Sequence, residues 1–313
     1  MAVQNISHRD VHQDAALTNF SVGFHPTGFV AEMIAPVIPV VKESDKYYVW
    51  GRQAAFQKYD SLRADGSRAR VVDFGLSTST YTAEEYALAT KVTEREKDNA
   101  DSVLRLRQSK TQLIIEKILL DQEARVAELF TTSGNYASGH VISPSVKWDA
   151  SSGTINILGD LDTATELVRK AIGKEPNKLL LGAEVAKAIM RNSTILDMVR
   201  YTQPNLLVAG GLPPTLRGMQ VMVAGATHTT SAEGATSVTY SDVWNDSVIV
   251  FYDPGASSID SPHFAKIFRA RPFRVNTWIE EAEANSEYIE PSIIQDEVIT
   301  NNNSGVFINN VLT

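Results

Sequence analysis

The chain has 313 residues, of which 43% are hydrophobic and 21% charged, with a formal net charge of −8 and no cysteine. The length accommodates two domains, or one domain with a long excursion, and the lack of cysteine excludes disulfides, thiolate metal sites and thiol catalysis. The acidic balance argues against a nucleic-acid-binding protein, which needs basic side chains to neutralise phosphates.

Two segment types that direct a chain to a membrane are missing from the sequence. No apolar run approaches the roughly 18 residues of a membrane span. Residues 1–30 also lack the basic and then apolar pattern of a secretory signal. We therefore expect no membrane partner, and a protein that remains in the cytoplasm of the cell that makes it.

Residues 1–28 show no long helical or strand periodicity. Two interpretations stay open for them: a frayed terminus, or an arm that becomes ordered only against a neighbour. In the segment that follows, Pro36 and Pro39 disfavour a helix and favour an extended run. This run ends in a predicted strand at residues 46–50.

Residues 47–92 are predicted to form a long hairpin with a charged tip. Its arms, residues 49–57 and 69–91, are rich in Val, Tyr, Thr and Phe, and they flank the turn signal Asp65-Gly66. An isolated hairpin is marginally stable in water, so we expect this one to lie on another surface. If that surface belongs to another copy, the tip selects its partner through complementary charges. The charged residues of the tip are Lys58, Asp60, Arg63, Asp65, Arg68 and Arg70.

A long helix is predicted over residues 97–133, because residues 94–133 contain neither Pro nor Gly and are rich in good helix formers. Asp98, Asn99 or Asp101 is the expected cap at its start, and Gly134 the expected end. Thirty helical residues extend about 45 Å. Taken alone, the helix is either a short coiled-coil seam or an ordinary long surface helix. Its expected apolar stripe consists of Leu106, Leu113, Ile114, Ile118, Leu120, Ala127 and Leu129.

A compact α/β or α+β module of normal domain size is predicted after residue 159. Asp160 is the expected cap of its first helix, which runs to about residue 175. Pro176-Asn177 turns the chain into an apolar strand. The remaining predicted elements are a strand at 179–182, helices at 183–191 and 193–201, and strands at 220–224, near 237–240 and at 247–252.

The final segment, residues 256–313, alternates strongly in hydrophobicity. Phe273, Val275, Thr277 and Ile279 are predicted to lie on one face of a strand. We expect these strands to return and pack on the long helix, which makes the first domain discontinuous in sequence.

No group of residues indicates catalysis, a cofactor or a bound metal. The sequence lacks the phosphate-binding loop, the dinucleotide-binding glycines and the nucleophile-elbow motif. His8 and His12 are four residues apart but lack the Glu of a zinc-protease motif, so we interpret them as solvated. One acidic cluster has the residue type that in principle binds a cation, but we interpret it as the solvated face of a strand. That cluster comprises Glu280, Glu281, Glu283 and Glu287.

Several stretches match one family in order and spacing, although no single one is diagnostic. They are residues 81–90 before the helix, residues 119–130, the pair Trp148 and Asp149, residues 176–189, 193–203, 218–228 and 243–252. Together they cover essentially the whole chain. The sequence resembles the major capsid protein of tailed bacteriophages, whose fold, the Hong Kong phage capsid fold, is shared with encapsulin shells.

The resemblance implies an α+β fold in which the long helix is the spine of a peripheral domain and the hairpin is an extended loop. An axial domain, inserted in the peripheral domain, meets its copies at the capsomer centre, with residues 202–218 approaching the symmetry axis. The implied boundaries are 1–30 for the N-terminal arm, 31–159 and 256–313 for the peripheral domain, 160–255 for the axial domain, 47–92 for the loop and 97–133 for the spine.

The resemblance also implies where subunits touch. Some members crosslink subunits through a Lys of the extended loop, and Lys58 lies in a suitable region, but no Asn partner or catalytic Glu is identified and we do not predict a crosslink. The expected contact residues are Lys58, Arg63, Asp65, Arg68 and Arg70 in the extended loop, and Pro204, Gly210, Gly211, Pro213 and Pro214 near the axial tip.

The sequence thus predicts a structural protein, not an enzyme, that assembles with itself through pentamers and hexamers into an icosahedral shell around phage DNA. The DNA is enclosed without sequence-specific binding, and scaffolding, portal and decoration proteins are further candidate partners. The expected location is the virion, with assembly in the host cytoplasm. One alternative is an encapsulin-like compartment shell that holds a cargo enzyme. Another alternative is an α/β enzyme. A pocket that contains titratable groups with shifted pKa values would indicate it.

Overall fold

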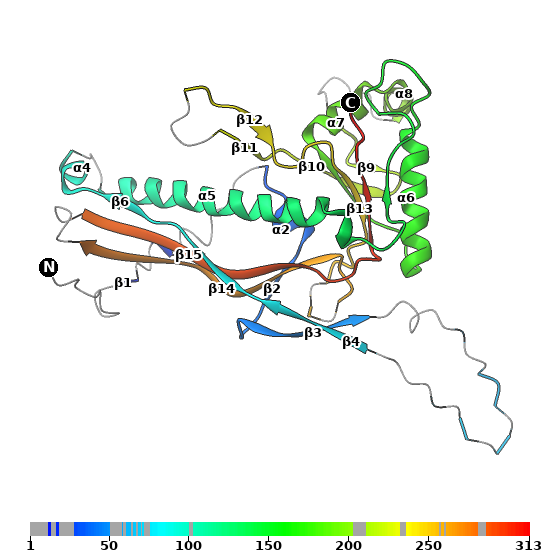
Figure 1. Cartoon of the computed structure of the whole chain (residues 1–313), viewed down its shortest axis with the longest axis horizontal. Helices are drawn as coiled ribbons and strands as arrows, with labels where there is room; N and C mark the ends of the chain where they lie inside the picture. The colour runs from blue at the N-terminus through cyan, green and yellow to red at the C-terminus, as the bar shows by residue number, and fades with distance from the viewer. Residues whose placement is uncertain are drawn as a thin grey trace.

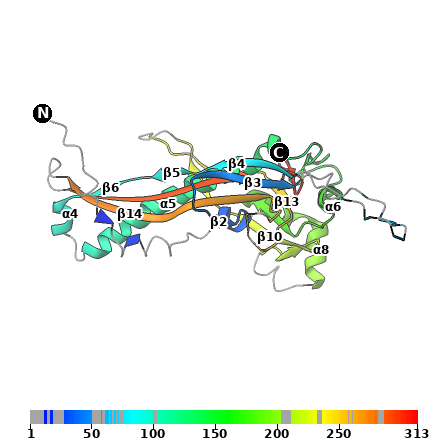
Figure 2. The ribbon, with the colours of Figure 1, turned by 90° about the horizontal axis from the view of Figure 1, so that it is seen from below.

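The structure is a computed structural model of the chain. Figures 1 and 2 show an elongated molecule in which a long helix lies along two long strands and ends beside a second, more compact unit. The residues that the structure describes are 12–13, 17–18, 28–50, 58, 61–63, 65–66, 68–69, 71, 76–99, 103–202, 211–231, 236–256, 258–259, 261–280 and 286–313.

The predicted spine is present as a short helix, α4 (Glu94–Asp98), followed by α5 (Val103–Thr131). Thr93 is the N-cap of α4: its hydroxyl accepts a hydrogen bond from the Glu96 amide, and the Glu96 carboxylate accepts one from the Thr93 amide. The predicted caps Asp98 and Asn99 are therefore wrong, because Asp98 is the last residue of α4 and Asn99 is its C-cap; Asp101 lies outside the described residues. Helix α5 ends two residues before the predicted end, and a 3₁₀ turn, η1 (Ser133–Asn135), follows.

The buried face of α5 follows the 3.6-residue period of a straight helix. Ile115, Ile118, Val126 and Phe130 are at most 3% exposed, whereas Leu113 is 54% exposed. The prediction that Leu113 lies on the apolar stripe is wrong, because a heptad spacing drifts by about 20° per seven residues on an unsupercoiled helix. Helix α5 packs on strands, so the coiled-coil interpretation is also wrong.

Two long antiparallel strands, β14 (Ala265–Glu280) and β15 (Ser286–Ile299), lie along α5 (Figure 1). The expectation that the tail returns to pack on the long helix is confirmed, because α5 contacts β15. The ladder is irregular between Arg269 and Arg274, a stretch that contains Pro272, whose missing N–H cannot join a ladder. Four short strands complete the sheet: β1 (His12–Gln13), β2 (Val37–Pro39), β5 (Glu84–Ala87) and β6 (Thr90–Val92).

The predicted alternation of β14 holds for three of its four positions. Phe273, Val275 and Thr277 are buried, between 0% and 9% exposed. Ile279 is 64% exposed, so its predicted burial is wrong. It lies one residue from the end of β14, where the strand has fewer neighbours to cover it.

The second unit is a six-stranded sheet with helices on one face. The sheet order is β7-β16-β13-β8-β10-β9, and β8 and β10 pair in parallel. Strands β7 and β16 lie outside the predicted axial boundaries, 160–255. The strands are β7 (Val141–Ile142), β8 (Lys178–Gly182), β9 (Thr215–Leu216), β10 (Met219–Ala224), β13 (Val248–Phe251) and β16 (Gly305–Ile308). The helices are α6 (Ile157–Ile172), α7 (Ala183–Arg191) and α8 (Ser193–Thr202), and β11 (Thr227–Thr229) and β12 (Tyr240–Asp242) form a separate ribbon.

Helix α6 begins and ends earlier than predicted. Its N-cap is Asn156, whose side-chain oxygen accepts a hydrogen bond from the Gly159 amide. The predicted cap Asp160 instead lies in the first turn and accepts a hydrogen bond from the Trp148 indole, 2.9 Å away. The helix ends at Ile172 because Gly173 takes a left-handed conformation with φ of 71°.

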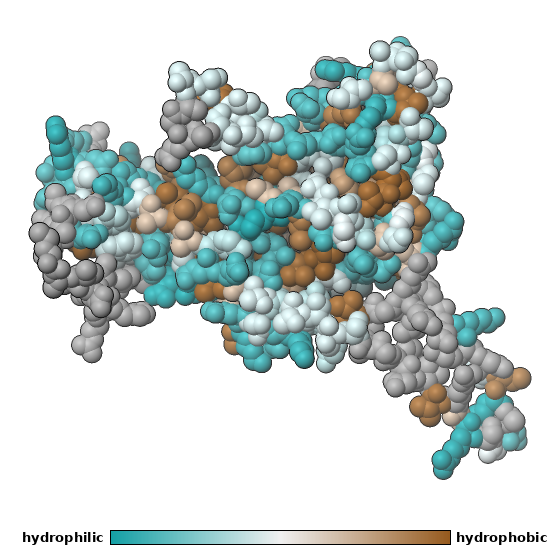
Figure 3. Space-filling view, viewed as in Figure 1, coloured by the Kyte–Doolittle hydropathy of each residue, from teal (hydrophilic) through white to brown (hydrophobic). Residues whose placement is uncertain are grey.

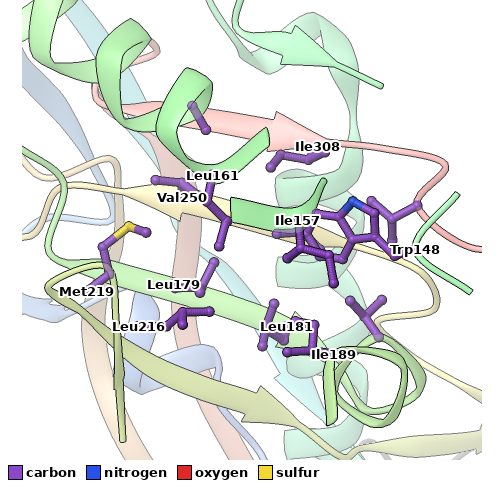
Figure 4. Close-up of a cluster of buried hydrophobic side chains, with 14 of the residues drawn as sticks. Trp148, Ile157, Leu161, Leu179, Leu181, Ile189, Leu216, Met219, Val250 and Ile308 are labelled. Carbon is purple, nitrogen blue, oxygen red and sulfur yellow. The ribbon is translucent and has the colours of Figure 1, made fainter. Parts of the chain in front are cut away.

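The sheet of the second unit is buried on both faces, so its strands read as continuous apolar runs. Leu179, Leu181 and Val250 face α6 and α7 and belong to the core drawn in Figure 4. The alternate residues Leu180 and Phe251 face the other way, into a second core that includes Phe130 of α5 and residues of α2 (Ala31–Ile34). This second core joins the spine to the compact unit.

Among the described residues, the base of the predicted hairpin is formed: β3 (Ser44–Trp50) pairs antiparallel with β4 (Leu76–Thr82). The strand predicted at residues 46–50 is confirmed. The prediction that the second arm continues to residue 91 is wrong, because β5 and β6 pair with β15 and not with β3. The one-turn helix α2 was also not predicted; it fits between residue 30 and Pro36.

Among the helices in the described ranges, none is long and apolar enough to cross a membrane.

The core between α5 and the second unit provides a test of which face of α5 is buried. The Phe130 ring has its centroid 5.1 Å from that of Phe264 and 6.0 Å from that of Trp244. We expect Phe130→Ala to lower the free energy of unfolding by about 3–5 kcal/mol, the cost of a large cavity. We expect Leu113→Ala, on the exposed side of the same helix, to change it by less than about 0.5 kcal/mol. Urea unfolding of both variants measures this, and equal losses would contradict the assigned buried face.

Candidate subunit-interaction surfaces

The extended loop is held away from the body by a packed base. The rings of Tyr47 and Tyr81 lie 5.4 and 4.5 Å from that of Phe268 in β14. The Tyr81 hydroxyl donates to the Lys42 carbonyl, and the Asp296 carboxylate accepts from the Thr82 amide. The position of the loop base, β3 and β4, against β14 is therefore fixed by buried aromatic contacts.

The loop residues that the sequence predicted as contacts are solvent-exposed. Lys58, Arg63, Asp65 and Arg68 are all exposed, and within the described residues none of them forms an ion pair; Arg70 lies outside those residues. Two apolar side chains share this surface: Leu62 is 91% and Val71 is 92% exposed. Figure 3 shows apolar and charged side chains next to one another at the far end of the loop. A single copy thus leaves both charge and apolar area in water there.

The predicted axial tip is placed only in part. Pro204 and Gly210 lie outside the described residues. Gly211 and Pro213 are half-buried and Pro214 is exposed, before strand β9, and the Pro214 carbonyl accepts a hydrogen bond from the Val221 amide. Residues 211–214 lead into β9 of the second unit, whereas the base of the extended loop is the β3–β4 pair, so the described parts of the two segments lie at different places in the molecule (Figure 1).

A buried carboxylate that the sequence analysis missed fixes the point where the N-terminal segment meets the spine. Glu123 of α5 is fully buried; its side chain accepts hydrogen bonds from the amides of Val30, at 3.1 Å, and Ala31, at 2.8 Å, and from the Trp244 indole, at 2.6 Å. Burial raises the pKa of Glu123, although these hydrogen bonds oppose the rise. The available signal in the sequence was a Glu four residues after Leu119 and three before Val126, on the apolar face of the helix.

Ion pairs attach both ends of the spine to β15. Glu287 is 3% exposed; it pairs with Lys97, at 2.6 Å, and with Arg107. Burial raises the pKa of Glu287, but hydrogen bonds from Arg107 and Lys97 outweigh it and leave the pKa below its usual value. The interpretation of this Glu as part of a solvated face is therefore wrong. Glu281 and Glu283 lie outside the described residues.

At the other end of the spine, Arg125 reaches Glu297 of β15 at 2.9 Å and also pairs with Asp121. The guanidinium carbon lies 3.6 Å from the ring centroid of Tyr86 in β5, in cation–π contact. The spine is thus attached to the sheet by charges as well as by its apolar face.

The described surface includes a larger and a smaller hollow. The larger, about 520 Å³, is lined by polar and acidic residues that include Glu184, Asp242 and Asp246. The smaller, about 300 Å³, lies where α2 meets α5. Within the described ranges, no group of three or more His, Asp or Glu side chains is placed to hold a metal ion.

No family model matches the chain. It is 24% identical over 244 residues to the "Major capsid protein" of Burkholderia phage BcepMu, which covers 77% of this chain and 76% of that protein. Among solved structures, a phage-related protein from Bordetella bronchiseptica superposes with a TM-score of 0.73 at 21% identity, covering 96% of this chain and 97% of that one. The capsid of the cyanophage P-SCSP1u superposes with a TM-score of 0.64 at 9% identity, over 91% of this chain and 89% of that one. The chain has the phage major-capsid fold.

The capsid fold confirms the resemblance inferred from the sequence and the predicted α+β class. It spans nearly the whole chain, so the spine and the second unit are parts of one fold. The predicted domain boundaries and contact residues remain predictions.

The buried carboxylate at the junction of the capsid fold predicts a pH effect. Because the pKa of Glu123 is raised on folding, the folded chain retains a proton that the unfolded chain releases, and stability falls as the pH rises from about 4.5 through the raised pKa. We expect Glu123→Gln to remove this pH dependence. The unfolding free energy of the parent minus that of the variant should therefore decrease as the pH rises from about 4.5 through the raised pKa. Urea unfolding between pH 4.5 and 8 measures it.

Glu166 is the matched control for this measurement. Hydrogen bonds from Arg169 and Lys170 lower the pKa of Glu166 to about 2, so its contribution is lost only as the pH falls below about 4.5. The unfolding free energy of the Glu166→Gln variant should therefore change with pH in parallel with that of the parent between pH 5 and 8. A Glu123→Gln profile that is also parallel to the parent would show that the buried carboxyl does not titrate there.

Proposed function

We propose that this chain is a structural major capsid protein, which assembles with itself through pentamers and hexamers into an icosahedral shell around phage DNA. One observation carries the proposal: a sequence relative named "Major capsid protein" spans three quarters of both chains, and the chain has the capsid fold over nearly its full length. In this proposal the chain acts by association and not by catalysis.

The geometry of the single chain supports association. The extended loop carries exposed Arg63, Asp65 and Arg68 together with exposed Leu62 and Val71, and its base packs on Phe268 of β14. Contacts made by several such surfaces are individually modest, but they add up through effective concentration once copies are held in a ring. Modest contacts also allow a wrongly placed copy to leave before the shell closes.

The net charge of −8 fits a shell that encloses DNA without binding its sequence, because an acidic protein does not neutralise phosphates. The partners in this proposal are other copies of the chain, with scaffolding, portal and decoration proteins as further candidates. The location is the virion, after assembly in the host cytoplasm. The encapsulin-like alternative is not favoured, because the sequence relative described above is a phage protein.

Negative-stain electron microscopy of the purified protein after size exclusion tests the proposal. We expect closed shells, or five-fold and six-fold rings, and nucleic acid inside particles taken from infected cells. A uniform small species that persists across protein concentration and salt, even when the chain is produced with its neighbouring phage structural genes, would contradict it. Particles that hold a protein cargo and no DNA would support the compartment alternative.

The charged loop yields a prediction with a residue-matched control. We expect Arg63→Glu, Arg68→Glu and Arg70→Glu together to lower the yield of particles at least about tenfold, because like charges placed opposite each other cost several kcal/mol. The thermal midpoint of the unassembled chain should stay unchanged, since exposed side chains contribute little to folding. The control replaces the same three residues with Lys, which keeps the charge and should preserve assembly. Equal yields from the Glu and Lys variants would rule out a charge contact at the tip.

A further inference from the structure

The larger hollow, in the second unit, is built from parts of the chain that are far apart in sequence. Its volume is about 520 Å³, within the range of small-ligand sites. Its walls come from the first turn of α7, from β12, from the turn between β12 and β13, and from residues 310–313. Figure 1 shows these elements on one side of the second unit. The fold thus brings them together at one place on the surface.

The backbone around the hollow is held by the core beneath it. Trp244 and Val311 are 1% and 0% exposed, and they lie directly before Asn245 and directly after Asn310 in the chain. A Cβ atom added to Gly182 would lie 2.0 Å from the Asn245 carbonyl oxygen, so this turn packs directly on the start of α7. The lining is therefore in place before a ligand arrives, which reduces the entropic cost of binding.

The hollow offers hydrogen-bond acceptors and donors that the chain itself leaves unused. Glu184, Asp242 and Asp246 supply carboxylates, which accept. Asn245 and Asn310 supply amides, which both donate and accept. Within the described residues, none of these five side chains has a hydrogen-bond or ion-pair partner. A ligand that both donates and accepts would satisfy all of them.

One wall of the hollow is an exposed aromatic ring. Tyr240 of β12 is 74% exposed, and Asp242, two residues along the same strand, lies on the same face of the ribbon. An aromatic ring left in water beside a polar hollow offers a flat apolar surface, on which C–H groups of a ligand can lie. The hollow therefore combines one apolar platform with many polar groups.

This combination distinguishes between classes of ligand. In the described ranges no three or more His, Asp or Glu side chains are placed to hold one metal ion, so the carboxylates act singly. An ammonium or guanidinium group only donates, and it would leave the amide N–H groups of the hollow unused. Each sugar hydroxyl both donates and accepts, and a sugar ring also has a face of C–H groups. Acidic sugars are disfavoured, because the carboxylates repel them.

We propose that this hollow binds a neutral oligosaccharide. Tyr240 stacks on the C–H face of one sugar ring, the amides of Asn245 and Asn310 donate to its oxygens, and the carboxylates accept from its hydroxyls. The inference goes beyond the proposed function and does not require assembled copies, because one chain supplies the whole lining.

Binding of the full-length chain to immobilised oligosaccharides tests the inference. The neutral probes are oligomers of glucose, mannose, galactose and N-acetylglucosamine, and the acidic counterpart is oligogalacturonate. We expect retention on at least one neutral series and none on oligogalacturonate. Tyr240→Ala should raise the Kd for the retained sugar about tenfold, because the stacking surface is lost. The matched control is Tyr48→Ala in β3, a tyrosine that is 52% exposed outside the hollow, and it should leave the Kd unchanged.

A second variant removes one hydrogen-bonding group without straining the backbone. Asn310 has a φ of 57°, in the left-handed region that glycine adopts freely, so Asn310→Gly deletes the amide and keeps the conformation. We expect it to raise the Kd about three- to tenfold, the cost of a lost hydrogen bond. The thermal midpoint of each variant, compared with that of the parent, separates lost binding from unfolding.

Three outcomes would overturn the inference. They are no retention on any neutral oligosaccharide, a Kd that neither Tyr240→Ala nor Asn310→Gly changes, and retention of a lysine-rich peptide in place of sugars. The last result, if it depended on Tyr240, would assign the hollow to a cationic protein segment. Failure of the proposed function is seen separately, in electron microscopy of the unmodified chain.

Discussion

The rest of the structure depends on one long helix whose single apolar face is buried against two sheets at once. Toward its N-terminal half, Ile114, Ile115 and Ile118 pack on β14 and β15. Toward its C-terminal end, Val126 and Phe130 pack on the sheet of the second unit. Because one helix of 29 residues, about 44 Å at 1.5 Å per residue, contributes to both cores, it fixes the two sheets relative to each other.

Polar contacts on the same helix fix its position along its own axis relative to the sheets. Apolar packing alone tolerates small slides along the helix axis, whereas Arg107 with Glu287 and Arg125 with Glu297 join particular turns of α5 to particular residues of β15. Glu123 does the same for the N-terminal segment and for Trp244 of the second unit. A carboxylate in this position is costly to bury, and its hydrogen bonds offset part of that cost.

What one copy leaves unsatisfied is consistent with association. The loop has exposed Leu62, Val71 and Arg63, and within the described residues the hollow beside α2 has an unpaired amide, Gln122, and an exposed methionine, Met33. These features are unfavourable for an isolated chain.

The sequence by itself determined the elements whose signals are local. Helix α7 and the strand at residues 46–50 were found at or near their limits, and the long helix was found because 40 residues without Pro or Gly leave few alternatives. The order of those elements was enough to identify the capsid fold. Tertiary structure decided what local patterns cannot encode: that Leu113 faces water, that residues 84–92 pair with β15 and not with β3, and that Glu123 and Gln122 are buried. Each of these depends on which distant segment covers the residue, and burial by a partner far along the chain leaves no periodic signal at the residue itself.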